Sequence, residues 1–152
     1  MTDVVLEMPG LARVQRAFLK LGDIDLRAAL DRIGAIVESQ TQERIARGKK
    51  SPQDENWEPW SDDYAETRSG RHSLLVGEGD LLRSIEHEVD GADVLLVGSN
   101  LVYAGALQFG NEGRGLPARP YIGVSSDDAD EIEKAISDWM QREVGSYFRG
   151  AA

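Results

Sequence analysis

The sequence predicts an α+β domain: a small antiparallel sheet, of about three or four strands, packed against a long N-terminal helix and a C-terminal helix. Three patterns lead to this prediction. Apolar residues recur at helical spacing over residues 24–47, a polar–apolar alternation surrounds an Asp-Gly turn within 84–98, and a second helical stripe follows 125–128. The length of 152 residues is typical of a single domain.

The long N-terminal helix has one apolar face, formed by Leu26, Leu30, Ile33 and Val37. Asp23 is placed as its N-cap, and Gly48 supplies its end after Arg47. Upstream, residues 11–21 predict a short basic helix. The simplest interpretation of the apolar face is one side of a hydrophobic core.

The sheet begins with a hairpin. Ile85, His87 and Val89 alternate with glutamates, Asp90-Gly91 starts a turn, and residues 94–97 return as the second strand. Residues 101–109 predict a short helix closed by Gly110, and residues 121–124 predict a third strand.

The C-terminal helix begins at Ser125-Ser126-Asp127-Asp128, where hydroxyl and carboxylate groups suit a helix start. Its apolar stripe includes Ile132, Ile136 and Trp139, and Gly145 predicts its end. We therefore divide the chain into an N-terminal arm or short helix (1–22), one α+β domain (23–145) with a long loop at 48–73, and a flexible tail (146–152).

Composition excludes several classes of protein. Apolar runs reach only four or five residues, as at Val94–Val97, whereas a membrane-spanning helix needs about 20. The N-terminus has no pattern of a signal peptide. The chain has no cysteine, so it has neither disulfides nor thiolate metal sites, which fits a reducing cytoplasm.

The net charge of −10 argues against a general nucleic-acid-binding protein. The charge is concentrated in residues 51–100, where twelve acidic and three basic side chains give −9. Two interpretations remain open: a solvated acidic surface that maintains solubility, or an acidic channel wall along which DNA passes without binding.

No catalytic pattern emerges from the sequence. The two histidines, His72 and His87, lack the spaced partners of a metal site, and there is no Gly-x-Ser-x-Gly nucleophile motif or P-loop. Asp62-Asp63 and Asp127-Asp128 are explained by helix starts. We therefore predict no catalytic, cofactor-binding or metal-binding residues, no cofactor, and no enzymatic activity.

The loop 48–73 is long enough to suggest a function, because long loops in compact domains are usually functional or ordered by a partner. One helical turn is expected at 61–67, capped by Ser61. Trp57 and Trp60 either form a small satellite core that pins the loop or anchor a partner, since tryptophan is enriched in interface hot spots.

The segment 100–120 combines an expected core helix with an exposed loop. We expect Tyr103, Leu107 and Phe109 to be buried against the sheet, and the Gly-rich loop 111–116 to be ordered by assembly. In Pro117-Ala118-Arg119-Pro120, the two prolines hold Arg119 in a preset pose for pairing with a carboxylate. That carboxylate lies either within the domain or across a subunit boundary.

The order of several short motifs resembles the phage virion morphogenesis family, the tail-completion proteins of Mu-like and related tailed phages. The resemblance covers about residues 24–143 and includes Gly48-x-x-Ser51-Pro52, Trp57-x-Pro59, Gly79-x-Leu81-x-x-Ser84-Ile85, Val97-Gly98-Ser99-Asn100-x-x-Tyr103-Ala104-x-x-x-Gln108-Phe109-Gly110 and Pro117-Ala118-Arg119-Pro120-Tyr121-Ile122-Gly123. Two features depart from the family pattern: Pro52–Asn56 lacks the usual glycine, and the basic stretch before Gly79 is reduced to Arg68, Arg71 and His72.

The resemblance implies a structural protein at the head–tail junction: a tail-completion, tail-terminator or neck protein that forms a ring of its own copies, for example a hexamer. The implied partners are the neighbouring neck, connector and tail-tube proteins, with genomic DNA passing nearby without specific binding. The implied location is the virion, after assembly in the host cytoplasm. The expected subunit or partner contacts are Lys49, Lys50, Trp57, Trp60, Asn111, Arg114 and Arg119.

Two alternatives remain open. One is a morphogenesis factor needed for head or tail assembly but absent from the mature particle. The other is an unrelated binding module or small enzyme.

Overall fold

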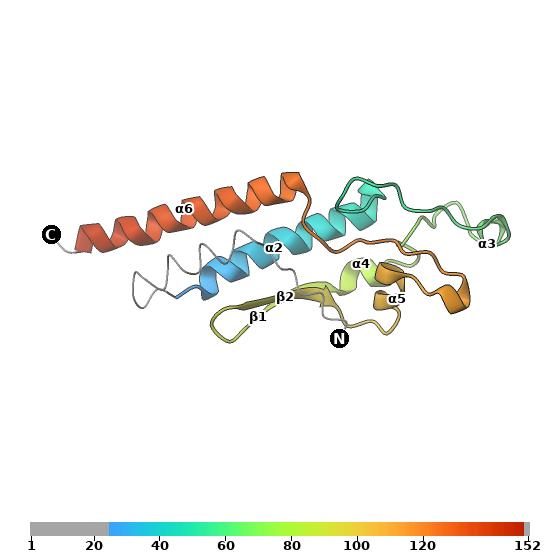
Figure 1. The fold of residues 1–152 in the computed structure, drawn as a ribbon, viewed down its shortest axis with the longest axis horizontal. Helices are drawn as coiled ribbons and strands as arrows, with labels where there is room; N and C mark the ends of the chain where they lie inside the picture. The colour runs from blue at the N-terminus through green and yellow to red at the C-terminus, as the bar shows by residue number, and fades with distance from the viewer. Residues whose placement is uncertain (1–24, 151–152) are drawn as a thin grey trace.

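The structure is a computed structural model, which describes residues 25–150, with side chains described up to Glu143. A long helix, α2 (Arg27–Glu43), continues into a single π-helical turn, η1 (Arg44–Gly48). A hairpin of β1 (Ile85–Asp90) and β2 (Val94–Ser99) packs against α2, and so does the C-terminal helix α6 (Ser126–Gly150). In Figure 1, α2 lies between α6 and the hairpin, which makes it the central element of the fold.

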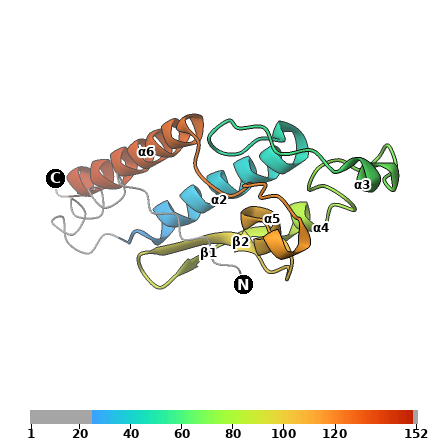
Figure 2. The ribbon, with the colours of Figure 1, turned by 45° about the vertical axis from the view of Figure 1, so that its right-hand side comes forward.

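The shorter elements lie at one end of the molecule. They are α3 (Asp62–Glu66), α4 (Asp80–Ser84), α5 (Ala104–Phe109) and the 3₁₀ turn η2 (Glu112–Arg114). Figures 1 and 2 place them at the end opposite the tip of the hairpin. The α+β class, the long helix, the C-terminal helix and an antiparallel sheet are therefore confirmed.

The apolar stripe of α2 forms the core as predicted. Leu30, Ile33 and Val37 are buried, and Ile33 and Val37 pack with Val97 of the hairpin and Ile132 of α6. The helical structure reaches the predicted end at Gly48, although its last turn is π-helical. The predicted basic helix at 11–21 and the cap Asp23 lie outside the described residues.

The hairpin has the predicted strands and a regular register. Ile85 pairs with Ser99, His87 with Val97 and Asp90 with Val94, so that residues 91–93 form the turn. Gly91 has a φ of 65°, a left-handed conformation that glycine adopts without steric cost.

The predicted third strand at 121–124 is wrong. In the described part of the chain the sheet has two strands, and residues 121–124 follow an irregular path. Tyr121 and Ile122 are nevertheless buried in the core, so the apolar pattern indicates burial correctly and strand pairing incorrectly. The helix α4, for its part, was not predicted.

The C-terminal helix starts with a reciprocal cap. The backbone N–H of Asp128 donates to Ser125 Oγ (3.1 Å), while Ser125 N–H donates to Asp128 Oδ2 (2.8 Å). Asp128 also accepts from Arg44 Nη2 at 2.7 Å, which ties the end of α2 to the start of α6. The predicted end at Gly145 is wrong: α6 continues to Gly150, because one glycine costs a helix only about 1 kcal/mol.

Gly34 allows α2 to approach the hairpin closely. A Cβ at this position would lie 2.4 Å from His87 Cδ2 and 2.7 Å from Leu95 Cδ1. The His87 ring cannot move away easily, because Glu38 Oε2 lies 2.6 Å from its Nδ1. The side of α2 that faces the hairpin therefore requires a residue without a side chain.

We expect Gly34→Val to lower the free energy of unfolding by about 1–3 kcal/mol, since overpacking displaces well-packed neighbours. Ala35→Val, on an exposed position of the same helix, is the matched control and is expected to cost about 0.7 kcal/mol or less. Urea unfolding followed by circular dichroism measures both. Equal losses in the two variants would contradict the close approach.

Candidate interaction site

The end of the molecule that holds α3, α4 and α5 has its own hydrophobic cluster. Its buried members come from segments distant in sequence: Ile45, Trp57, Leu81, Ile85, Ala104, Tyr121 and Ile122. This cluster joins the loop after η1, the first strand and the segment 116–124. It provides a fixed base for the exposed groups at this end.

Gln108 of α5 organises the irregular segment 121–122. Its buried side chain accepts from the backbone N–H groups of Tyr121 (2.9 Å) and Ile122 (3.0 Å), and its Nε2 donates to the Ile122 carbonyl (3.1 Å). A buried N–H group without a partner costs about 1–3 kcal/mol. The Gln108 amide thus provides the hydrogen bonds that a neighbouring strand would otherwise supply.

Tyr121 adds a second link to α5. Its hydroxyl donates to the Ala104 carbonyl at 3.0 Å, and its ring is almost fully buried. Burial, with a smaller contribution from Tyr103, raises the pKa of Tyr121 to about 12. The phenol therefore remains neutral, and keeps donating its proton, up to strongly alkaline pH.

The two tryptophans of the long loop differ in their roles. Trp57 is buried and donates from Nε1 to the Pro120 carbonyl at 2.8 Å, so it pins the loop to the domain. Trp60 is half-buried, and its ring meets Tyr64 of α3 edge to face at 5.8 Å. The satellite-core interpretation thus describes Trp57, whereas Trp60 lies nearer the surface.

Arg119 is held in place within the domain. The side chain is 4% exposed, with Nε donating to the Glu58 carbonyl (2.8 Å) and Nη2 to the Pro59 carbonyl (3.1 Å). Its intrachain partners are main-chain carbonyls and not the expected carboxylate. Burial lowers the pKa of Arg119, against smaller opposing effects of Glu58 and Tyr64.

The two lysines of the loop have different surroundings. The ammonium of Lys49 donates to the carbonyls of Ile45 and Leu74 (2.9 Å to Leu74), and burial lowers its pKa. Lys49 therefore joins η1 to the segment before α4. Lys50 forms a surface ion pair with Asp54 at 2.8 Å.

The loop after α5 is closed by Asn111. Its Oδ1 accepts from the backbone N–H of Arg114 (3.2 Å), and its main chain pairs with Leu116. Arg114 itself is exposed. Asn111 thus shapes the loop, and Arg114 is the side chain that the loop presents to the surface.

The prediction that Tyr103 and Phe109 are buried is wrong. Tyr103 is 46% exposed and Phe109 is 66% exposed, while Val102 is fully exposed. Ala104 and Gln108 are the buried residues of α5, since Gln108 is drawn inward by its bonds to Tyr121 and Ile122. The helix and the two residues before it therefore present large apolar side chains to solvent.

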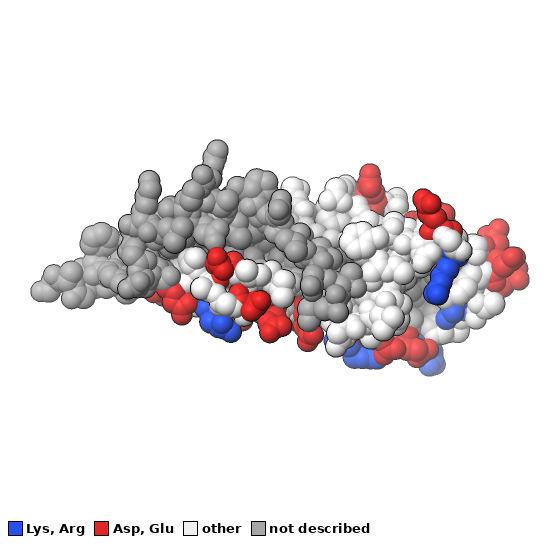
Figure 3. Space-filling view, turned by 60° about the horizontal axis from the view of Figure 1, so that its bottom comes forward, with Lys and Arg blue, Asp and Glu red and all other residues white. Residues whose placement is uncertain are grey.

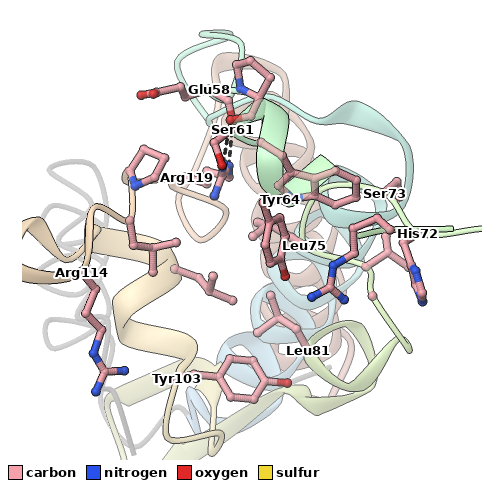
Figure 4. Close-up of a pocket in the computed structure, with 18 of the residues that line it drawn as sticks. Glu58, Ser61, Tyr64, His72, Ser73, Leu75, Leu81, Tyr103, Arg114 and Arg119 are labelled. Carbon is pink, nitrogen blue, oxygen red and sulfur yellow. Dashed lines mark hydrogen bonds between the residues drawn. The ribbon is translucent and has the colours of Figure 1, made fainter. Parts of the chain in front are cut away.

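An open hollow of about 740 Å³ lies among α3, α4, α5 and η2. Its lining combines aromatic, aliphatic and arginine side chains, including Trp60, Tyr64, Arg68, Tyr103, Leu107, Arg114 and Arg119. Figure 4 shows Arg119, Tyr64, Leu75, Tyr103 and Arg114 arranged around a central opening. Of the residues expected at contacts, Trp60, Arg114 and Arg119 line the hollow, whereas Lys49, Lys50, Trp57 and Asn111 do not.

Other features that could indicate a function among the described residues are a metal site, a membrane-spanning helix and a basic surface. Residues 25–143 contain no group of three or more His, Asp or Glu side chains that could hold a metal ion. No helix among the described residues is long and apolar enough to cross a membrane. Among the described residues on the face shown in Figure 3, lysines and arginines lie among acidic and uncharged side chains and form no continuous basic area.

A fixed scaffold with large apolar side chains exposed at one end is typical of a protein-interaction module. The family profile described as the phage virion morphogenesis family matches residues 10–141, and the chain belongs to this family. The resemblance deduced from the motif order is therefore confirmed.

Two relatives extend the comparison. The chain is 33% identical over 135 residues to a "Putative capsid assembly protein G" of Escherichia phage Mu, covering 82% of this chain and 86% of the relative. It is also 33% identical over 91 residues to an uncharacterized protein of Methanocaldococcus jannaschii, covering 55% of this chain and 66% of that protein. No solved structure matches.

We expect Gln108→Ala to lower the free energy of unfolding by about 2–6 kcal/mol, because two buried N–H groups lose their acceptor at about 1–3 kcal/mol each. Urea unfolding monitored by tryptophan fluorescence measures this loss. The control Gln53→Ala removes an exposed glutamine and is expected to change stability by less than about 0.5 kcal/mol. A Gln108→Ala change as small as that of the control would show that the amide does not hold this segment.

Proposed function

We propose that the chain is a structural component of a tailed-phage virion that acts at the head–tail junction, as a ring-forming tail-completion or neck protein. Membership of the phage virion morphogenesis family supports a role in particle assembly. The Mu relative carries the word "assembly" in its name, in agreement with such a role. In this role the protein would join the head to the tail through its contact surfaces, and the role requires no chemical reaction.

The observation that carries this proposal is the concentration of exposed apolar side chains at one end. Four of the five large exposed hydrophobic residues among the described ones lie there: Tyr64, Val102, Tyr103 and Phe109. Exposed apolar patches mark interaction sites, since water contact with them is unfavourable. This end is therefore the surface for a neighbouring protein of the particle.

The acidic surface suits a protein beside a DNA channel. The middle third of the chain has a net charge of −9, and like charges repel a phosphate backbone. A ring with such residues toward its centre lets DNA pass without binding it. DNA contact is therefore nonspecific and weak in this proposal.

A phage lacking the gene for this chain is expected to produce separate filled heads and tails, seen by electron microscopy, and the intact gene is expected to restore joined particles. Mass spectrometry of purified particles should then detect the chain. Joined particles without the chain would contradict a virion component and favour an assembly factor that leaves the particle. Normal joining in the deletion phage would contradict both roles.

The surface itself is tested in the same assay. Phe109→Asp is expected to reduce the yield of joined particles at least about tenfold, because a hot-spot loss above 1.4 kcal/mol is a tenfold loss of affinity. Its fold should be intact, since Phe109 is largely exposed. Ser39→Asp, on an exposed position of α2, is the control and should join heads to tails normally.

A further inference from the structure

The hollow at the α3–α5 end contains a buried cation with unused hydrogen-bond donors. Arg119 uses Nε and Nη2 for the Glu58 and Pro59 carbonyls, and its Nη1 has no partner among the described residues. An arginine has five N–H donors in a planar fork that suits a carboxylate. The Nη1 group of Arg119 can therefore donate a hydrogen bond to an acceptor from outside the chain.

Among the described residues no carboxylate is hydrogen-bonded to this cation, and Glu58 acts on it only through its charge. Glu78 is hydrogen-bonded to His72 at 2.9 Å, and Asp80 pairs with Arg83 at 2.6 Å. The third acid at the rim is Glu58, and Figure 4 shows its carboxylate directed away from the opening. The acidic groups that line the hollow are thus occupied or turned outward.

Two further arginines add to the positive charge. Arg68 lies over the Tyr64 ring, with its guanidinium carbon 4.3 Å from the ring centroid. Arg114 lies on another side of the opening in Figure 4, and it lines the hollow as Tyr103 does. The hollow therefore offers three arginines together with aromatic surface, in a chain whose net charge is −10.

A segment of complementary chemistry lies at the turn of the β1–β2 hairpin of the same chain. The hairpin tip, Asp90-Gly91-Ala92-Asp93-Val94, is exposed along its whole length and presents the carboxylate of Asp90. Val94 is the fifth of the large exposed hydrophobic residues. The tip therefore combines acidic and apolar groups, as the hollow combines basic and aromatic ones.

We infer that the hollow of one copy receives the hairpin tip of a second copy. In this contact Asp90 faces the guanidinium groups of Arg119 and Arg114, and Val94 faces the aromatic side chains that line the hollow. This inference rests on the proposed ring and names its subunit contact. The hollow of about 740 Å³ is within the range of about 300–1,000 Å³ that binding sites commonly have. The five-residue hairpin tip thus suits the available space.

The position of the two surfaces determines the assembly that they form. The hairpin tip points away from α3, α4 and α5 (Figure 1), whose residues line the hollow, so one copy cannot fill its own hollow. Contact between two different surfaces is heterologous, and repetition of such a contact gives a ring when the rotation closes. The proposed ring therefore needs this contact to close and needs no two-fold interface.

Cysteine cross-linking tests the contact directly, because the chain has no cysteine of its own. Ser61→Cys places a thiol at the exposed rim of the hollow, and Ala92→Cys places one at the hairpin tip. The two singly substituted proteins are mixed and oxidised mildly. We expect disulfide-linked heterodimers in clear excess over either homodimer on nonreducing gels.

The matched control replaces the rim by another exposed serine. Ser39→Cys lies on α2, away from the hollow, and is mixed with Ala92→Cys in the same way. It should give heterodimers only at the random level. An equal yield in the two mixtures would overturn the inference, and so would a monomer at every concentration in sedimentation equilibrium of the unmodified chain.

Charge reversal tests the chemistry of the contact. Arg114→Glu or Asp90→Arg alone should weaken self-association roughly tenfold or more, and mixing the two variants should restore it. Both positions are exposed, so circular dichroism should show unchanged folding. Failure of the mixture to recover would overturn the pairing of the tip with the hollow.

The outcomes separate this inference from the proposed function. If Arg114→Glu blocks head–tail joining but leaves self-association unchanged, the hollow binds another virion protein and not a second copy. If neither property changes while deletion of the gene still prevents joining, the contact assigned here is wrong and the head–tail role stands. If deletion has no effect on joining, the proposed function itself is wrong.

Discussion

The hydrogen bonds between the Gln108 amide and the main chain of residues 121–122 are the interaction on which the functional end depends. Three bonds of 2.9–3.1 Å fix an irregular segment that has no strand beside it. That segment places Tyr121 and Ile122 in the core, and its preceding residues place Arg119 and the Trp57 acceptor, Pro120. Without it, the hollow would have no fixed wall on the α5 side.

The same interaction explains why the α5 aromatics face solvent. A helix of six residues has one inward side, and Ala104 and Gln108, four residues apart, occupy it. Tyr103 and Phe109 are thereby directed outward, where they are exposed. A polar residue at a core position thus determines which apolar residues become available to a partner.

The sequence was informative where local patterns and tertiary structure agree. The α2 stripe, the Asp90-Gly91 hairpin and the Ser125–Asp128 cap each have a repeating or capping signal that depends on nearby residues. The prediction of a strand at 121–124 was wrong. A buried run of apolar residues has the same sequence pattern whether its main chain pairs with another strand or with one glutamine side chain. The prediction that Phe109 is buried was wrong for a related reason. Glutamine is usually exposed, so the sequence did not indicate that Gln108 takes the inward side of α5 and leaves Phe109 in solvent.

The site was predictable only in part. Trp60, Arg114 and Arg119 were identified from their sequence context and do line the hollow. Lys49 and Trp57 were identified as well, but they bind main-chain carbonyls within the domain. Tyr64, Arg68 and Tyr103 were missed as members of the hollow, because segments far apart in the sequence come together there only after folding.

The most direct measurement of the central claim is amide hydrogen exchange at residues 121 and 122, followed by NMR. If Gln108 replaces a strand, the N–H groups of Tyr121 and Ile122 should exchange as slowly as those of the paired β1 and β2 strands. The exposed residues Glu112 and Gly113 provide the fast reference in the same spectrum. Exchange at 121 and 122 as fast as in that loop would contradict the claim.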